Sequence, residues 1–144
     1  MISEMNLQDL ENIKDCLLTD FDNFWSYNIL KQELENGKSK YFVAKQENEI
    51  VGFAGILLII DQVNIMNIVV KKSFRHNGIG SILLENLISY AKDKDLKTIT
   101  LEVNEHNLSA IKLYDKFNFD HIGIRKKYYN GESDAIIMSK HLDT

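Results

Sequence analysis

The 144-residue sequence contains no proline and a single cysteine, Cys16. One cysteine excludes an internal disulfide, and we expect its side chain to be a small buried hydrophobic group. The longest apolar run, residues 51–60, is too short to cross a bilayer as a helix. The N-terminus has no basic segment followed by an apolar run, so we predict no signal peptide and expect a cytoplasmic protein without a membrane partner.

The length predicts a single domain over residues 1–144, long enough to bury a sizeable core. The composition is 44% hydrophobic and 26% charged, which is typical of globular domains. A formal net charge of −4 argues against a protein whose main role is to bind nucleic acid. His106, His121 and His141 have no spacing typical of metal ligands, so we expect no metal site.

Apolar periodicity predicts strands and helices without repeats or linkers. We expect helices at about residues 6–19, 26–37, 81–94 and 107–117. We expect strands at about residues 1–5, 41–45, 49–60, 63–70, 98–103, 121–129 and 133–139. Gly52 and Gly55 indicate a bulge or close packing, and Asn130-Gly131 a tight turn. One strand–helix–strand crossover among antiparallel strands predicts a mixed, mostly antiparallel sheet of the α/β or α+β class.

The stretch from Met66 to Ser81 combines a buried strand, a glycine loop and the start of a helix. The loop reads Arg75-x-x-Gly78-x-Gly80. Free N–H groups at a helix N-terminus favour an anion, and glycines let the backbone approach a diphosphate closely. The loop has neither the ending of a Walker motif nor the pattern G-x-G-x-x-G. It resembles the acetyl-CoA pyrophosphate loop of the GNAT acetyltransferases.

Two further residues are candidates for catalysis. Glu102 lies near the end of the strand at 98–103, on the face opposite to its apolar side chains, where a carboxylate can act as a general base. Tyr114 lies in the following helix, for which Asn107 is a natural N-cap. A solvated or paired carboxylate and a core tyrosine are the alternatives for the two residues. The pattern Asn107-x-x-Ala110-Ile-x-Leu-Tyr114 resembles the second cofactor motif of the GNAT family.

Within that family, the likeness narrows to the RimI type, the bacterial ribosomal-protein-alanine N-acetyltransferases. It covers nearly the whole chain, and its most specific part is Arg125-x-x-Tyr128-Tyr129 followed by Asp134-Ala135. The resemblance implies a GNAT fold with about seven strands and about four helices. It also implies acetyl-CoA as cosubstrate and, as acceptor, a protein N-terminal α-amine, with the alanine terminus of a small-subunit ribosomal protein as the first candidate.

The resemblance also implies roles for individual residues. Glu102 would be the general base and Tyr114 the general acid of a direct transfer. The residues implied in cofactor binding are Ile68, Val69, Val70, Arg75, His76, Asn77, Gly78, Ile79, Gly80, Ser81 and Asn107. The residues implied in substrate binding are Trp25, Asn67, Tyr128 and Tyr129. Two alternatives stay open: an acetyltransferase for a lysine side chain or a small amine, and a non-catalytic sensor that binds CoA. The oligomeric state cannot be read from the sequence.

Overall fold

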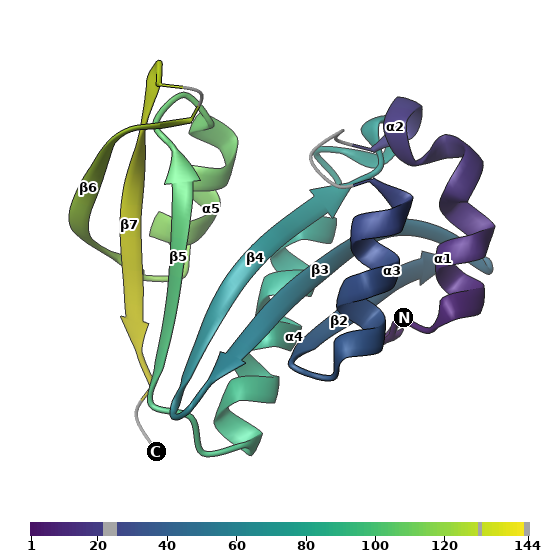
Figure 1. The fold of residues 1–144 in the computed structure, drawn as a ribbon, viewed down its shortest axis with the longest axis horizontal. Helices are drawn as coiled ribbons and strands as arrows, with labels where there is room; N and C mark the ends of the chain where they lie inside the picture. The colour runs from purple at the N-terminus through teal and green to yellow at the C-terminus, as the bar shows by residue number, and fades with distance from the viewer. Residues whose placement is uncertain (22–25, 130, 143–144) are drawn as a thin grey trace.

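The computed structural model describes residues 1–21, 26–129 and 131–142 (Figure 1). The strands are β1 (Ile2–Glu4), β2 (Ser39–Gln46), β3 (Glu49–Ile59), β4 (Gln62–Val70), β5 (Thr98–Asn104), β6 (Asp120–Tyr129) and β7 (Ser133–His141). The helices are α1 (Leu7–Ile13), α2 (Leu17–Asp20), α3 (Tyr27–Asn36), α4 (Ile79–Asp93) and α5 (Leu108–Lys116), with the 3₁₀ turns η1 (Lys14–Cys16) and η2 (Lys72–Phe74). Trp25 and Asn130 lie outside the described residues.

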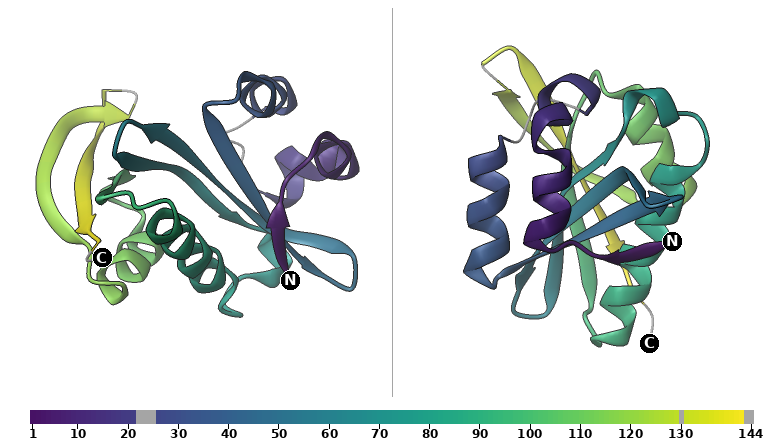
Figure 2. Two further views of the ribbon diagram at one scale, coloured as in Figure 1. Left: turned by 90° about the horizontal axis from the view of Figure 1, so that it is seen from below. Right: turned by 90° about the vertical axis from the view of Figure 1, so that its right-hand side faces the viewer.

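All strands belong to one sheet, in the order β1-β2-β3-β4-β5-β7-β6. Neighbouring strands are antiparallel except β4 and β5, which are parallel because α4 connects them by a crossover. This arrangement confirms the predicted mixed, mostly antiparallel sheet. Figure 2 shows α4 and α5 on one face of the sheet and α1 and α3 on the other. No helix in the described ranges is long and apolar enough to cross a membrane.

The two faces of the sheet carry separate hydrophobic clusters. On the α4 face, buried side chains recur along the helix at the spacing of one helical face: Leu83, Leu84, Leu87, Ile88 and Ala91. On the opposite face, the cluster includes Leu10, Phe21, Leu30, Tyr41 and Phe53. Gly55 lies under the Tyr41 ring, where a Cβ atom would clash with the ring carbons. The glycine therefore marks the close packing that the sequence predicts.

The predicted helix at 6–19 is interrupted. It begins as expected, with a reciprocal capping box between Asn6 and Asp9, but α1 ends at Ile13 and the turn η1 separates it from α2. Cys16 lies in that turn at the margin of the core and is only partly buried, so the expectation of a buried cysteine was wrong. The second helix, α3, ends at Gly37 in the left-handed conformation, as predicted.

A β-bulge divides β4 into two halves. Ile65 pairs with Ile56 and Asn67 pairs with Gly55, so Met66 is an extra residue in β4. A bulge bends its strand and increases the local twist. The parallel pairing of β4 with β5 ends at Ile65, directly before the bulge. Beyond that point the two strands diverge, as Figure 1 shows, and the edge of β4 facing β5 has no partner strand in the part of the chain that the structure describes.

Candidate active site

Two adjoining cavities, of about 440 and 600 Å³, open where β4 and β5 diverge. Both are lined by Ile68, Asn104, Asn107, Ala110 and Tyr114. They therefore form one cleft with two arms. The carboxylate arm is lined further by residues 64–67 and by Glu102, Val103, Tyr128 and Tyr129. The glycine-loop arm is lined further by Val70, Arg75, His76, Gly78, Ile79, Gly80, Ser81, His106, Ser109 and Leu113.

The glycine-loop arm ends at the N-terminus of α4. Gly78, with a φ of 79°, is the N-cap, and this left-handed residue starts the helix at Ile79, two residues before the predicted start. The first intrahelical hydrogen bond runs from the N–H of Ile82 to the carbonyl of Gly78, at 3.1 Å. The N–H groups of Ile79, Gly80 and Ser81 therefore have no partner within the helix. Together with the helix dipole, they make an anion-binding site.

The basic residues near the loop divide into two groups. Arg75 and His76 line the arm, and Arg75 Nε donates a hydrogen bond to the carbonyl of Val70, at 3.2 Å. Lys71 instead forms an ion pair with Glu49, with 2.9 Å between Nζ and Oε2. Of these side chains, those of Arg75 and His76 thus line the arm beside the N-terminal end of α4, whereas that of Lys71 does not.

Asn77 is a predicted cofactor-binding residue whose side chain turns back to its own loop. Its Nδ2 donates to the carbonyls of Phe74 and Arg75, at 3.2 and 3.3 Å. Asn77 is also absent from the residues that line the glycine-loop arm. In this conformation its side chain shapes the loop.

The open edge of β4 presents backbone groups from alternate residues. The N–H of Lys71 donates to the carbonyl of Val51 on β3, at 2.8 Å. Because N–H groups alternate in direction along a strand, the N–H of Val69 also faces β3, whereas those of Ile68 and Val70 face the cleft. The Val69 side chain is 1% exposed in the core. Of the three predicted residues on this strand, Ile68 and Val70 thus offer hydrogen bonds to a ligand.

Glu102 lies in the carboxylate arm, on the face of β5 opposite to the buried Ile99, Leu101 and Val103, as the alternation predicts. Its Oε1 accepts a charge-assisted hydrogen bond from Arg125 Nη2 at 2.9 Å. The Arg125 guanidinium also lies over the ring of Tyr128, 5.1 Å from the ring centroid. Arg125 therefore links the candidate base, Glu102, to the ring of Tyr128.

Tyr114 stands at the junction of the two arms. It projects from α5, whose N-cap is Asn107, with Asn107 Oδ1 accepting from the N–H of Ala110 at 3.2 Å. The Tyr114 ring packs against Phe119, with 5.5 Å between ring centroids, and only 6% of the residue is exposed. This burial raises the pKa of the Tyr114 phenol, and Tyr129 adds a smaller contribution. The phenol consequently stays protonated at neutral pH.

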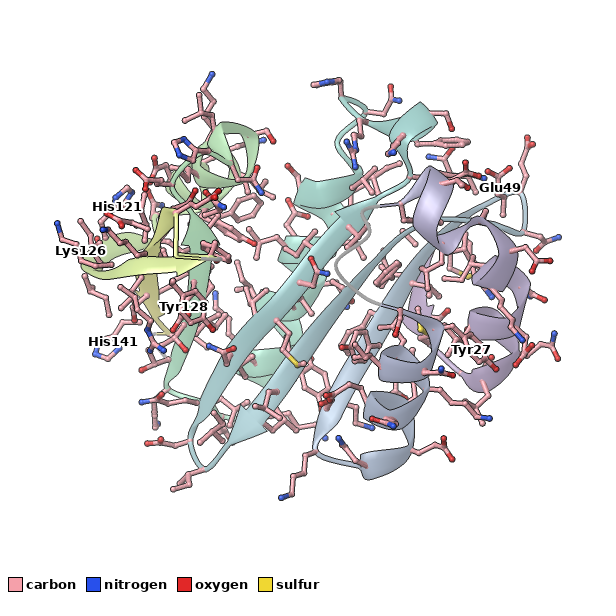
Figure 3. All side chains as sticks on the ribbon, turned by 45° about the horizontal axis from the view of Figure 1, so that its top comes forward. Tyr27, Glu49, His121, Lys126, Tyr128 and His141 are labelled. Carbon is pink, nitrogen blue, oxygen red and sulfur yellow. The ribbon has the colours of Figure 1, made fainter. Side chains whose placement is uncertain are left out.

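Tyr128 and Tyr129 cover the carboxylate arm from β6. Their rings pack edge to face, 5.1 Å apart, and burial is the main cause that raises the pKa of Tyr129, followed by Glu102 and Tyr128. Figure 3 shows Tyr128 on the cleft side of the hairpin and Lys126 extending outward. Asn67 lines the same arm, and its Nδ2 is buried without a hydrogen-bond partner in the described ranges. A buried unpaired amide of this kind is a natural contact for a ligand carbonyl.

Several lining residues were missed by the sequence reasoning. Asn104 lines both arms and could have been found, because it lies two residues after Glu102 on the same face of β5. His106 carried no comparable signal. The ion pair of Arg125 with Glu102 was also missed, since it joins two strands that are distant in sequence.

Comparison with known proteins identifies the class. The model of the acetyltransferase (GNAT) family matches residues 7–119. The ribosomal protein bS18-alanine N-acetyltransferase of Haemophilus influenzae (strain ATCC 51907 / DSM 11121 / KW20 / Rd) is 36% identical over 82% of this chain and 82% of its own. A Bacillus subtilis (strain 168) protein, provisionally named for the same activity, is 34% identical over 95% of this chain and 92% of its own.

The solved structures agree with this family assignment. The crystal structure of the ribosomal-protein-S18-alanine N-acetyltransferase from Escherichia coli aligns with a TM-score of 0.90 and 28% identity, covering 100% of this chain and 94% of that one. The family match and the fold together define an acetyltransferase. The chain belongs to the GNAT family and, within it, to the RimI type.

Proposed function

We propose that this acetyltransferase moves the acetyl group of acetyl-CoA to the N-terminal α-amine of a protein. The first candidate acceptor is the alanine terminus of ribosomal protein bS18, on which the named relatives act. The observation that carries the proposal is the position of Glu102 and Tyr114, one in the carboxylate arm and the other where the two arms join. A single domain over residues 1–144 and a cytoplasmic location are parts of the same proposal.

The glycine-loop arm fits acetyl-CoA, the acetyl donor used in this family. The N–H groups at the start of α4 and the guanidinium of Arg75 would hold the diphosphate. His76 and Asn107 would lie along the same arm. The backbone groups of Ile68 and Val70 would pair with the amides of the pantetheine, as a peptide adds to a sheet edge. Bound there, the cosubstrate supplies an activated acetyl group.

Glu102 is proposed as the general base. A peptide α-ammonium has a pKa of about 7.7–8.0, so much of it must lose a proton before it can react at neutral pH. Arg125 binds Oε1 of Glu102, and no hydrogen bond from the described residues reaches Oε2. We therefore assign Oε2 to the substrate proton, taken directly or through one water.

Tyr114 is proposed as the general acid. The amine forms the new C–N bond while the C–S bond breaks, and the departing thiolate takes the phenolic proton. Burial raises the pKa of Tyr114, so the proton is present when it is needed. The N–H group of Ile68, a residue that lines both arms as Tyr114 does, would polarise the reacting carbonyl.

The acceptor peptide is proposed to enter beside the tyrosine pair. Tyr128 and Tyr129 would cover its first residues, and the unpaired amide of Asn67 would bind a peptide carbonyl. Trp25, the fourth predicted substrate contact, lies outside the described residues.

Two substitutions test these roles. Glu102→Gln should lower kcat by about 10²–10⁴-fold, because it removes a general base. Tyr114→Phe should lower kcat less, because a thiolate needs less help to leave. Glu85→Gln is the matched control, since Glu85 is exposed on α4 and does not line the cleft. If Glu102→Gln and Tyr114→Phe both keep the wild-type kcat, the assignment of base and acid is wrong.

A further inference from the structure

The β6–β7 hairpin contains an irregularity beside the carboxylate arm. Arg125 pairs with Ala135 and Tyr129 pairs with Ser133, so three residues of β6 lie opposite a single residue of β7. The middle one, Lys127, has a φ of 50°, in the left-handed region that residues with a Cβ atom rarely adopt. A strained conformation of this kind persists only where the surrounding structure holds it.

The residue opposite this bulge is Asp134, and it is the one that holds Lys127. Asp134 Oδ1 accepts from the N–H of Lys127 at 2.8 Å. The N–H of Asp134 donates to Glu105 Oε2 at 2.6 Å, and the N–H of Glu105 donates to the carbonyl of Asp134 at 3.0 Å. We call Asp134, Lys127 and Glu105 the Asp134 clip. Because Glu105 directly follows β5, the clip ties the bulge in β6 to the end of the strand that carries Glu102.

The bulge sets the direction of the side chains on either side of it. Arg125 before the bulge reaches Glu102, with 2.9 Å between Nη2 and Oε1. Tyr128 directly follows Lys127, lies 5.1 Å from the Arg125 guanidinium and packs on Tyr129. A regular strand would place alternate residues on opposite faces and could not bring these groups together in this way.

We propose that the Asp134 clip positions Tyr128, Tyr129 and Arg125 over Glu102 and thereby sets the affinity for the acceptor peptide. The inference rests on the proposed N-terminal acetylation. Asp134 is a positioning residue, because it does not line the cleft and acts through the backbone of Lys127. If Asp134 only stabilised the hairpin, its loss would lower the stability of the protein but would not change the KM for the peptide more than the KM for acetyl-CoA.

The test is the peptide KM of Asp134→Ala, which removes the acceptor for the Lys127 N–H. We expect it to rise about tenfold, while the acetyl-CoA KM changes less than about twofold, because the residues that the clip positions line the carboxylate arm and not the glycine-loop arm. Asp134→Asn keeps an oxygen at the same place and should stay within about twofold of wild type. The matched control is Glu132→Ala, an exposed residue of the same turn.

A second substitution tests the conformation itself. Glycine adopts positive φ without strain, so Lys127→Gly in the Asp134→Ala background should restore most of the peptide affinity. Hydrogen exchange gives a readout independent of activity: the Lys127 amide should exchange faster in Asp134→Ala than in Glu132→Ala.

The possible outcomes distinguish a failure of the Asp134 clip hypothesis from a failure of the proposed function. A wild-type enzyme that acetylates no peptide N-terminus would overturn the proposed function, and with it the peptide role of the clip. An active wild type with an unchanged peptide KM in Asp134→Ala would overturn the clip alone. An equal rise in both KM values, or no recovery with Lys127→Gly, would also overturn the clip.

Discussion

At the scale of single residues, two buried tyrosines link the packing of the core to pH. Burial raises the pKa of Tyr114 and of Tyr41 above the ordinary value of about 10, and Glu33 adds to the effect at Tyr41. In both cases the folded state holds the phenolic proton more tightly than the unfolded chain does. The resulting stability is fully present below about pH 10 and is lost as the pH rises toward the folded values.

This reasoning gives a prediction for unfolding in alkali. The free energy of unfolding should fall by about 1.4 kcal/mol per pH unit above pH 10 for each of these tyrosines. Tyr41→Phe should remove the contribution of Tyr41 to this loss of unfolding free energy. Urea unfolding of the variant and of wild type at pH 8 and pH 11 measures the difference. Tyr90→Phe, at a half-buried position, is the control. An identical slope in wild type and Tyr41→Phe would contradict the argument.

Short patterns within one strand and one helix made Glu102 and Tyr114 candidates, and the resemblance to the GNAT family supplied their roles, which stay predictions. The partner of Glu102 could not be predicted in this way. Arg125 lies on β6, and β7 separates β6 from β5 in the sheet, so the ion pair depends on the strand order and on the bulge in β6. Contacts of this type are set by tertiary structure and leave no local pattern in the sequence.

At the scale of elements, the role of Gly78 at the start of α4 can be tested by comparing it with Gly37, a glycine of similar conformation at the end of α3. Gly78 and Gly37 have φ values of 79° and 77°, and at both a Cβ atom would meet no described residue within 4 Å. Gly78 caps the start of α4 in the glycine-loop arm, whereas Gly37 ends α3 and does not line the cleft. Their backbone strain is thus comparable, and only their position relative to the cleft differs.

Gly78→Ala and Gly37→Ala should each lower the free energy of unfolding by about 1–2 kcal/mol, because alanine resists the left-handed conformation. Only Gly78→Ala should also raise the acetyl-CoA KM, by about fivefold or more, because it shifts the N–H groups of α4. Urea unfolding and steady-state kinetics measure the two effects. Equal acetyl-CoA KM values for both variants would show that this helix end does not bind the diphosphate.

The elements themselves were largely predictable, since each strand and helix carries its own apolar face. The parallel β4–β5 pair and the closing hairpin agree with the sequence reasoning. The deviations were not predictable: the break at Lys14–Cys16, the extra Met66 and the left-handed Lys127. The bulge at Met66 and the clip at Lys127 depend on partner strands, and both shape the cleft.

At the scale of the whole molecule, the strands β1–β4 on one side of the cleft are joined to β5–β7 on the other side by the short paired part of β4 and β5. β4 and β5 pair only from Gln62 to Ile65 on the β4 side, below the divergence. The cluster on the α4 face nevertheless contains residues from both sides, including Leu83 of α4 and Met138 of β7. A continuous core of this kind favours unfolding as one unit.

We therefore expect a single cooperative transition. Urea unfolding followed by far-UV and by near-UV circular dichroism should give coincident curves, as for one domain. Two separated transitions would contradict the proposal that residues 1–144 form a single domain, and would place the boundary between the β1–β4 and β5–β7 sides.

The most direct test of the account is the position of the acetyl group on a panel of acceptors. The purified protein would be incubated with acetyl-CoA and short peptides that vary in their first residue, including an alanine-first ribosomal terminus. N-blocked peptides that contain lysine, and small amines, would be the controls, with products located by mass spectrometry. We predict acetylation of free N-termini, best with alanine first and lost in Glu102→Gln. Acetyl groups on lysine or on small amines alone would contradict the proposed function.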